Sequence, residues 1–219
     1  MLRRFRNRQD AGVQLAAKLA NYAGRPDVIV LGLPRGGIPV AYEVARALHA
    51  PLDLFVVRKL GVPGHRELAM GAMASGGVIV LNDEVMNALH LTRPIVEAVA
   101  AHERREMERQ QQAYRGDVPF PDLADRTVIV VDDGLATGST MRAAVMALRQ
   151  HRPARIVVAA PVAAAETCHT LANEADEVVC VSVPESFHAV SMWYEAFSQT
   201  TDEEVRHLLQ AARLETEVK

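Results

Sequence analysis

The sequence predicts an α/β protein with a doubly wound, mostly parallel sheet. Runs of β-branched and aliphatic residues alternate with segments of helical periodicity along most of the chain, and residues 128–131 are four β-branched residues in succession. Such a run is typical of a strand that helices cover on both faces. The alternation predicts parallel strands joined by right-handed crossovers.

The expected elements follow in order from the N-terminus. Apolar residues that recur every three or four positions predict helices at 8–23, 38–49, 92–115, 138–150 and 202–213. Short aliphatic runs predict strands at 28–33, 52–57, 78–81, 127–132, 155–160 and 177–183. The second half of 92–115 is dominated by charged residues and glutamines, so we expect a solvated face there, and mixed signs favour local pairing over nucleic-acid contact. Residues 116–125 are expected to be a linker.

Composition limits the classes of function. A chain of 219 residues with a hydrophobic content of 49% suits one α/β domain with an appendage. A net charge of -3, from 24 Lys and Arg against 27 Asp and Glu, indicates no surface for nucleic acid or an anionic membrane. We expect no signal peptide and no membrane span, and therefore a cytoplasmic protein with a small ligand.

The cysteines and histidines indicate no metal site built by the protein. Cys168 and Cys180 are the two cysteines, and the eight histidines are scattered. Neither set has the spacing of a disulfide framework or a zinc site. Any metal is expected to arrive with the substrate.

The most informative motif follows the strand at 127–132. Asp132 and Asp133 end this strand, and small residues then open a helix, namely Ala136, Thr137, Gly138, Ser139 and Thr140. Unpaired N–H groups at a helix N-terminus attract an anion, while carboxylates accept hydrogen bonds from hydroxyls. The spacing matches neither the Walker A nor the dinucleotide pattern. It predicts a site for a ribose 5-phosphate, and the alternative is a plain strand and capped helix.

A second turn of small residues follows the first strand, where Arg35, Gly36 and Gly37 lead into a helix. A guanidinium matches phosphate oxygens, and glycines allow a close approach of the backbone. We interpret these residues as a pyrophosphate-binding turn, although a plain strand-to-helix turn has the same pattern.

The strand at 52–57 leads into a basic pair, Arg58 and Lys59, and then into a glycine-punctuated stretch over about 60–77. A mobile loop with these cations could close over a crevice and neutralise charge on a leaving group. His65 and Glu67 lie in this loop and are candidates for proton transfer. The alternative is a hairpin with solvated charges.

Four aromatic residues cluster near the C-terminus, among them Trp193 and Tyr194. Aromatic rings there could stack on a nucleobase. Packing of this segment onto the sheet explains them equally well.

Together these motifs resemble those of the type I phosphoribosyltransferases, and in particular the uncharacterised group of predicted phosphoribosyltransferases. The resemblance covers most of residues 5–210, with decisive motifs in about thirty positions. It implies that Asp132 and Asp133 hold the ribose diol, 136–140 the 5-phosphate, and 35–37 the pyrophosphate, with a cis peptide at 34–35. It also implies a core over 1–183 and a C-terminal hood with a terminal helix over 184–219.

The activity that the resemblance implies is transfer of the 5-phosphoribosyl group from phosphoribosyl pyrophosphate to a nitrogenous base, with Mg²⁺ carried by the substrate. Nucleotide salvage and a homodimer are typical of such enzymes. Ala136 stands where oxopurine enzymes carry an aspartate, which disfavours an oxopurine acceptor. A sensor of phosphoribosyl pyrophosphate without catalysis is the main alternative, and a degenerate relative is a third.

Overall fold

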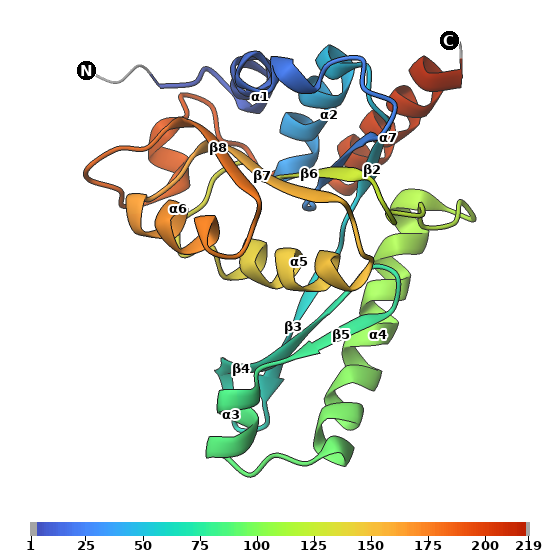
Figure 1. The fold of residues 1–219 in the computed structure, drawn as a ribbon, viewed down its shortest axis with the longest axis vertical. Helices are drawn as coiled ribbons and strands as arrows, with labels where there is room; N and C mark the ends of the chain where they lie inside the picture. The colour runs from blue at the N-terminus through green and yellow to red at the C-terminus, as the bar shows by residue number, and fades with distance from the viewer. Residues whose placement is uncertain (1–3, 218–219) are drawn as a thin grey trace.

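The computed structural model describes residues 4–217, and of Arg66, Glu67, Thr216 and Glu217 only the backbone. Its centre is a sheet of five parallel strands in the order β2-β1-β6-β7-β8 (Figure 1). The strands are β1 (Val28–Gly32), β2 (Leu52–Leu54), β6 (Thr127–Val131), β7 (Arg155–Val162) and β8 (Glu177–Ser182). The predicted α/β fold with a parallel sheet is confirmed.

Helices cover both faces of this sheet, with α1 and α2 on one side and α5 and α6 on the other (Figure 1). Alternate residues of β6 supply two cores: Ile129 and Val131 pack with α1 and α2, while Val128 and Val130 pack with α5. The run of β-branched residues therefore belongs to a strand buried on both faces, as predicted. The helices are α1 (Arg8–Lys18), α2 (Gly37–Leu48), α5 (Ser139–Gln150), α6 (Ala165–Ala172) and α7 (Asp202–Glu217), with a short 3₁₀ helix at Ala20–Tyr22.

The prediction of one strand over 52–57 is wrong. The strand predicted at 78–81 is confirmed, but it does not belong to the central sheet. Strand β2 ends at Leu54, and the chain then enters a separate antiparallel sheet of β3 (Val57–Val62), β4 (His65–Ala74) and β5 (Val78–Leu81). The change of sheet is fixed at two backbone N–H groups. Phe55 donates to the carbonyl of Gly32 at 3.0 Å, whereas Val56 donates to the Ser75 hydroxyl at 2.9 Å.

Residues 60–77, expected as an open loop, lie mostly in paired strands, so the hairpin interpretation is the one that the structure shows. Leu60, Met70 and Met73 are fully buried. Gly71 explains part of the glycine content, because a Cβ there would lie 2.4 Å from the carbonyl oxygen of Val80. That glycine allows two strands to approach each other closely.

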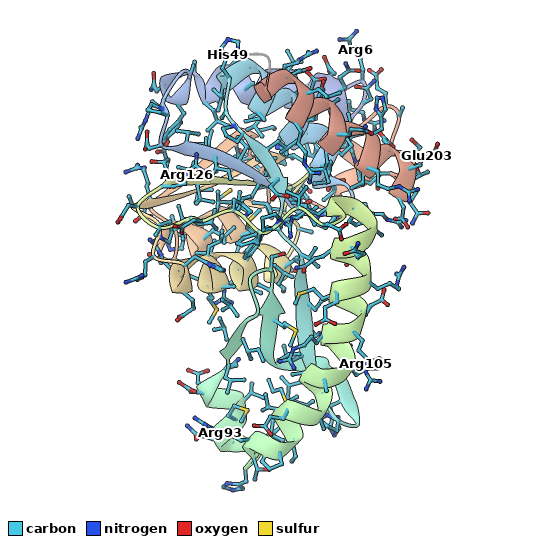
Figure 2. The ribbon with its side chains drawn as sticks, turned by 90° about the vertical axis from the view of Figure 1, so that its right-hand side faces the viewer. Arg6, His49, Arg93, Arg105, Arg126 and Glu203 are labelled. Carbon is cyan, nitrogen blue, oxygen red and sulfur yellow. The ribbon has the colours of Figure 1, made fainter. Side chains whose placement is uncertain are left out.

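The second sheet, α3 (Asp83–Ala88) and α4 (Arg93–Arg115) form an arm, residues 57–115, that projects from the core (Figure 1). Figure 2 shows the arm from the side, with α4 running along the strands and Arg93 near its outer end. The predicted solvated half of α4 is only partly so, since Met107, Tyr114 and Arg115 are buried. Among the helices of residues 4–217, none is long and apolar enough to cross a membrane.

The C-terminal segment returns to the core after β8. It contains a 3₁₀ helix at Val190–Trp193 and joins the N-terminus through a bridge between Phe5 and Tyr194. Both side chains are buried, with 3% exposure each. Residues 5–8 and residues 193–198 therefore lie side by side.

Candidate functional site

Asp132 and Asp133 stand at the carboxyl end of β6, between the ends of β1 and β7. The N–H of Leu33 donates to the carbonyl of Val131 at 2.9 Å, and the N–H of Asp132 to the carbonyl of Ala159 at 3.3 Å. The Asp133 N–H donates to Oδ1 of Asp132 at 2.8 Å. The crevice beyond the carboxyl ends of the strands is where open α/β sheets bind ligands, so the acids lie where the sequence placed them.

Gly36 and Gly37 press directly against the two acids. A Cβ on Gly36 would lie 2.1 Å from Oδ2 of Asp133, and one on Gly37 would lie 2.6 Å from the carbonyl oxygen of Val131. The φ of Gly36 is -61°, which any residue adopts, so lack of space and not backbone conformation requires glycine here. The peptide bond from Pro34 to Arg35 is cis. The structure thus brings the second turn of small residues onto the acid pair.

The turn over 136–140 is held in place by hydrogen bonds to β7 and α6, and most of its residues are exposed to solvent. Leu135 donates to the carbonyl of Val162 at 2.9 Å, and the Thr167 hydroxyl of α6 donates to the carbonyl of Ala136. Gly138 has a φ of 69° and leads into α5. Ala136, Thr137, Ser139 and Thr140 are exposed. Their hydroxyls and the first N–H groups of α5 can therefore reach an anion from solvent.

The two acids differ in their electrostatic surroundings. Oδ2 of Asp133 accepts a hydrogen bond from Nε of Arg8 at 2.8 Å. Burial raises the pKa of Asp132 to about 8, and the neighbouring charge of Asp133 adds to this shift. Burial also raises the pKa of Asp133, but Arg8 acts against that shift. At neutral pH the pair therefore carries its negative charge mainly on Asp133.

The raised pKa of Asp132 predicts a pH dependence of stability. The folded state binds this proton more tightly than the unfolded state, so the contribution of Asp132 is fully present below about pH 4 and is lost as the pH rises through about 8. Asp132→Asn is expected to flatten this fall and to stabilise the protein at pH 8 by about 1–2 kcal/mol. Urea unfolding of both proteins across this range measures the difference. Parallel curves would contradict the shift.

Comparison with known proteins identifies the family. A family model described as "Phosphoribosyl transferase domain" matches residues 2–196. The chain belongs to this family. A Mycobacterium tuberculosis (strain H37Rv) protein named "Putative phosphoribosyl transferase Rv0571c" is 46% identical over 208 residues, which cover 95% of the chain and 47% of that protein. The "Bifunctional protein PyrR" of Roseiflexus sp. is 32% identical over 138 residues, which are 63% of the chain and 56% of that protein. The chain thus spans about half the length of these relatives.

A solved structure agrees with this assignment. The crystal structure of TT1426 from Thermus thermophilus matches this chain with a TM-score of 0.83 and a sequence identity of 42%. The match covers 95% of this chain and 98% of that chain. The likeness extends over the arm as well as the sheet. The phosphoribosyl transferase domain of this chain therefore has the same overall architecture as a protein whose structure was determined experimentally.

Arg35 and the aromatic residues near the C-terminus of this phosphoribosyl transferase domain lie in different environments. Nη1 of Arg35 is 3.4 Å from Oδ1 of Asp202, at the start of α7, and the Arg35 side chain is 37% exposed. Trp193 is half-buried. Tyr194 is buried, with its ring against Phe5 and Phe197 and its hydroxyl donating to the carbonyl of Asp133 at 2.6 Å. Stacking of a base on Tyr194 is therefore wrong as a prediction, because neither ring face is open, and Tyr194 instead supports the acid pair from beneath.

The predicted basic pair lies on the arm. Arg58 is on β3 and forms an ion pair with Glu103 of α4 at 2.8 Å. Lys59 and His65 are exposed. Glu67 is on β4, and the structure describes only its backbone. The structure places these four residues on the second sheet and not on the central strands that carry the acid pair.

Three contributors to the site have no signal in the local sequence: Arg8, Tyr194 as a support, and Thr167 as an anchor of the turn. Each acts on a residue at least 31 positions away. Among the described residues no cluster of three or more His, Cys, Asp or Glu could hold a metal ion.

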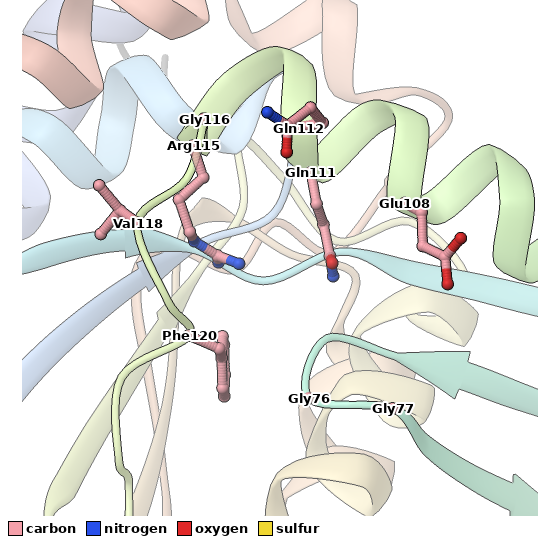
Figure 3. A pocket seen from close by; sticks show the side chains of 9 residues that line it. All are labelled: Gly76, Gly77, Glu108, Gln111, Gln112, Arg115, Gly116, Val118 and Phe120. Carbon is pink, nitrogen blue, oxygen red and sulfur yellow. The ribbon is translucent and has the colours of Figure 1, made fainter.

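A cavity of about 440 Å³ lies where the arm joins the core (Figure 3). Gln111 and Arg115 of α4 point into it, and Phe120 and the turn at Gly76 and Gly77 form its other side. Arg115 is buried and donates to Oδ1 of Asp53 at 3.2 Å and to the carbonyl of Leu54 at 3.0 Å. None of the predicted site residues lines this cavity. It belongs to the junction of arm and core.

Proposed function

We propose that the chain transfers the 5-phosphoribosyl group from phosphoribosyl pyrophosphate to a nitrogenous base and releases pyrophosphate. The observation that carries this proposal is the acid pair at the end of β6, with the exposed turn over 136–140 on one side and Gly36 and Gly37 packed against it on the other. A diol flanked by a phosphate and a diphosphate matches this order of groups.

In this proposal Asp132 and Asp133 accept hydrogen bonds from the ribose hydroxyls, and the turn from Ala136 to Thr140 binds the 5-phosphate. Arg35 and the N–H groups near Gly36 and Gly37 orient the pyrophosphate. The bond from C1 of the ribose to the pyrophosphate oxygen breaks with both electrons leaving on oxygen. A lone pair of the base nitrogen then forms the new bond to C1, and the base loses a proton.

Arg58 and Lys59 are proposed to neutralise the departing pyrophosphate, for which Arg58 would exchange Glu103 for the phosphate oxygens. His65 or Glu67 is proposed to take the proton from the base. Trp193, half-buried in the hood, is the remaining candidate for a contact with the base. Ala136 disfavours an oxopurine, as the resemblance implies.

Mg²⁺ fits this site as a companion of the substrate. Carboxylate oxygens are ligands that this cation accepts, and it prefers to keep phosphate oxygens and water. When bound with the diphosphate it supplies neutralising charge. A homodimer, a cytoplasmic location and a place in nucleotide salvage remain predictions.

The test is to incubate the protein with phosphoribosyl pyrophosphate, Mg²⁺ and a panel of nucleobases and to follow pyrophosphate release. Base-dependent release supports the transferase. Thermal stabilisation by phosphoribosyl pyrophosphate without release for any base would favour the sensor, and no stabilisation would contradict both.

Substitution of Gly36 tests the close packing on the acid pair. Gly36→Ala places a Cβ 2.1 Å from Oδ2 of Asp133, so the carboxylate must move. A shift of about 1 Å in a binding group can lower the rate by about 10²-fold, and we expect a loss of this size in turnover. Pyrophosphate release measures the loss, and thermal unfolding checks that the variant is folded. We expect it to fold, because alanine adopts a φ of -61° without backbone strain. Full activity would show that the packing is unimportant.

A further inference from the structure

Arg8 reaches the acid pair from the other end of the chain. It is the first residue of α1, and Nε donates to Oδ2 of Asp133 at 2.8 Å across 125 positions of sequence. Two contacts to the hood hold the same guanidinium. Nη1 donates to the carbonyl of Ser198 at 2.6 Å, and the guanidinium carbon lies 3.9 Å from the centre of the Phe197 ring. The Arg8 side chain is only 12% exposed.

These contacts fix the direction of the Asp133 carboxylate. Oδ2 is taken by Arg8, while Oδ1 accepts no hydrogen bond from the described residues and stays available for a hydroxyl hydrogen. The start of α1 is itself fixed, because Asn7 caps the helix by accepting a hydrogen bond from the N–H of Asp10 at 2.9 Å. The contacts with Ser198 and Phe197 hold the guanidinium in place, so a ligand hydroxyl would have to replace a charge-assisted hydrogen bond to reach Oδ2.

We propose that Arg8 is a positioning residue of the ribose subsite, which couples the hood to the acid pair and holds Asp133 as an oriented carboxylate with Oδ1 facing the donor's hydroxyls. This inference rests on the proposed function. It assigns to α1 and to Phe197 and Ser198 of the hood a part in binding the donor, in addition to any part of the hood in selecting the base.

The charge of Arg8 offsets the repulsion between the two adjacent acids. Adjacent half-buried carboxylates repel each other, and Arg8 is the cation that pairs with one of them. Around Asp133 the titratable or charged groups are Asp132 beside it on the same turn, Arg8 of α1, and Tyr194 of the hood, whose hydroxyl bonds the Asp133 carbonyl. Gly36 and Gly37, which pack against the pair at the start of α2, carry no charge. Without Arg8, Asp133 would ionise at higher pH, because burial alone raises its pKa.

The experiment measures the dissociation constant of phosphoribosyl pyrophosphate with Mg²⁺ for the whole chain and for Arg8→Gln, from about pH 5.5 to about pH 9. We expect Arg8→Gln to bind at least about tenfold more weakly near neutral pH, with the difference shrinking as the pH rises, since one unit of pKa corresponds to a factor of ten. Arg8→Lys, which keeps the charge but not the planar fork, is expected to lie between the two.

Arg6→Gln is the matched control. Arg6 lies two positions earlier, pairs with Asp10 at 2.9 Å, and is 72% exposed, so the same change there is expected to leave affinity and pH profile unchanged. Should Arg8→Gln fold poorly, Arg8→Gln combined with Asp133→Asn removes both charges together, and its affinity should equal that of Asp133→Asn alone.

The outcomes separate this inference from the proposed function. No binding of phosphoribosyl pyrophosphate by the unsubstituted chain overturns the proposed function and this inference with it. Binding by the unsubstituted chain and equal binding by Arg8→Gln at every pH overturns the inference alone. A constant loss at all pH values would show a merely structural role and would also overturn it.

Discussion

Replacing both acids of the pair, Asp132→Asn with Asp133→Asn, is expected to abolish transfer of the phosphoribosyl group and to weaken binding of phosphoribosyl pyrophosphate by about 10²–10⁴-fold. Asp133, which carries most of the negative charge of the pair, is proposed to accept a charge-assisted hydrogen bond from a hydroxyl, typically worth about 1.5–3 kcal/mol. Asp132 is proposed to accept a second hydrogen bond, typically worth about 0.5–1.5 kcal/mol. An amide accepts more weakly and turns a donor toward the same hydroxyl. Isothermal titration with the intact donor measures the loss.

The change also removes up to two negative charges, and a matched control separates charge from position. Asp83 and Glu84 are adjacent, exposed acids in the first turn of α3 on the arm. Asp83→Asn with Glu84→Gln has the same formal charge change and is expected to leave donor affinity unaltered. Equal affinity of the site variant and the unsubstituted chain would show that the acids do not hold the ribose.

Inorganic phosphate adds a second readout for the same variant. The turn over 136–140 is anchored by Thr167 and by the backbone of β7, not by the acids. Weak phosphate binding to this turn should therefore survive in the variant that has lost the intact donor. Loss of both would indicate that the substitutions collapse the turn.

The central strands and the acid pair were predictable because their signals are local. Residues 128–131 alternate between two cores, and only a strand covered on both faces uses four β-branched residues in that way. The acids follow directly, so their place at the end of β6 comes with the strand. The close contact of Gly36 with Asp133 has no such local signal, because it depends on the pairing of β1 with β6.

The strand at 78–81 and the helix at 92–115 of the arm were predictable from their patterns, but the separate sheet of the arm was not. The apolar run continues from β2 through Phe55 and Val56, both fully or almost fully buried, so hydrophobicity does not mark the point where the chain leaves one sheet for another. Glycine was misleading for a related reason. Gly71 indicates flexibility when taken alone, yet in the structure it lets β4 pair closely with β5. The length of a segment does not distinguish a short strand from a loop, because the two overlap in length.

Arg8 was missed because charged residues are common at helix ends and carry no information about a partner 125 positions away. The aromatic cluster near the C-terminus includes Phe197, whose ring packs on the Arg8 guanidinium, but the sequence alone does not show that this segment lies beside the acid pair. Nothing in the sequence says which of the 24 basic residues provides it.

The largest loss of stability is expected at the junction of arm and core, from Arg115→Met. The Arg115 and Asp53 side chains are 5% and 10% exposed, and burial raises the pKa of Asp53 although Arg115 acts against that shift. Methionine fills the space but removes the guanidinium that is hydrogen-bonded to the buried Asp53 carboxylate, and leaves only the charge of Arg213 acting on it. Breaking a buried pair in this way costs about 3–5 kcal/mol, which urea unfolding would report as a lower midpoint.

The double variant Arg115→Met with Asp53→Asn distinguishes charge from packing. The amide oxygen can still accept the N–H of Leu54, which donates to Oδ1 of Asp53 at 2.7 Å, while no unpaired charge remains. Most of the lost stability should therefore return, because removing both members of a buried pair is often nearly neutral. Arg109→Met serves as the control on the same helix, since Arg109 forms an exposed pair with Glu106 and its loss should not be measurable. If the double variant is as unstable as Arg115→Met, the contacts of Arg115 with Phe120 and Leu54 hold the arm, and the ion pair does not.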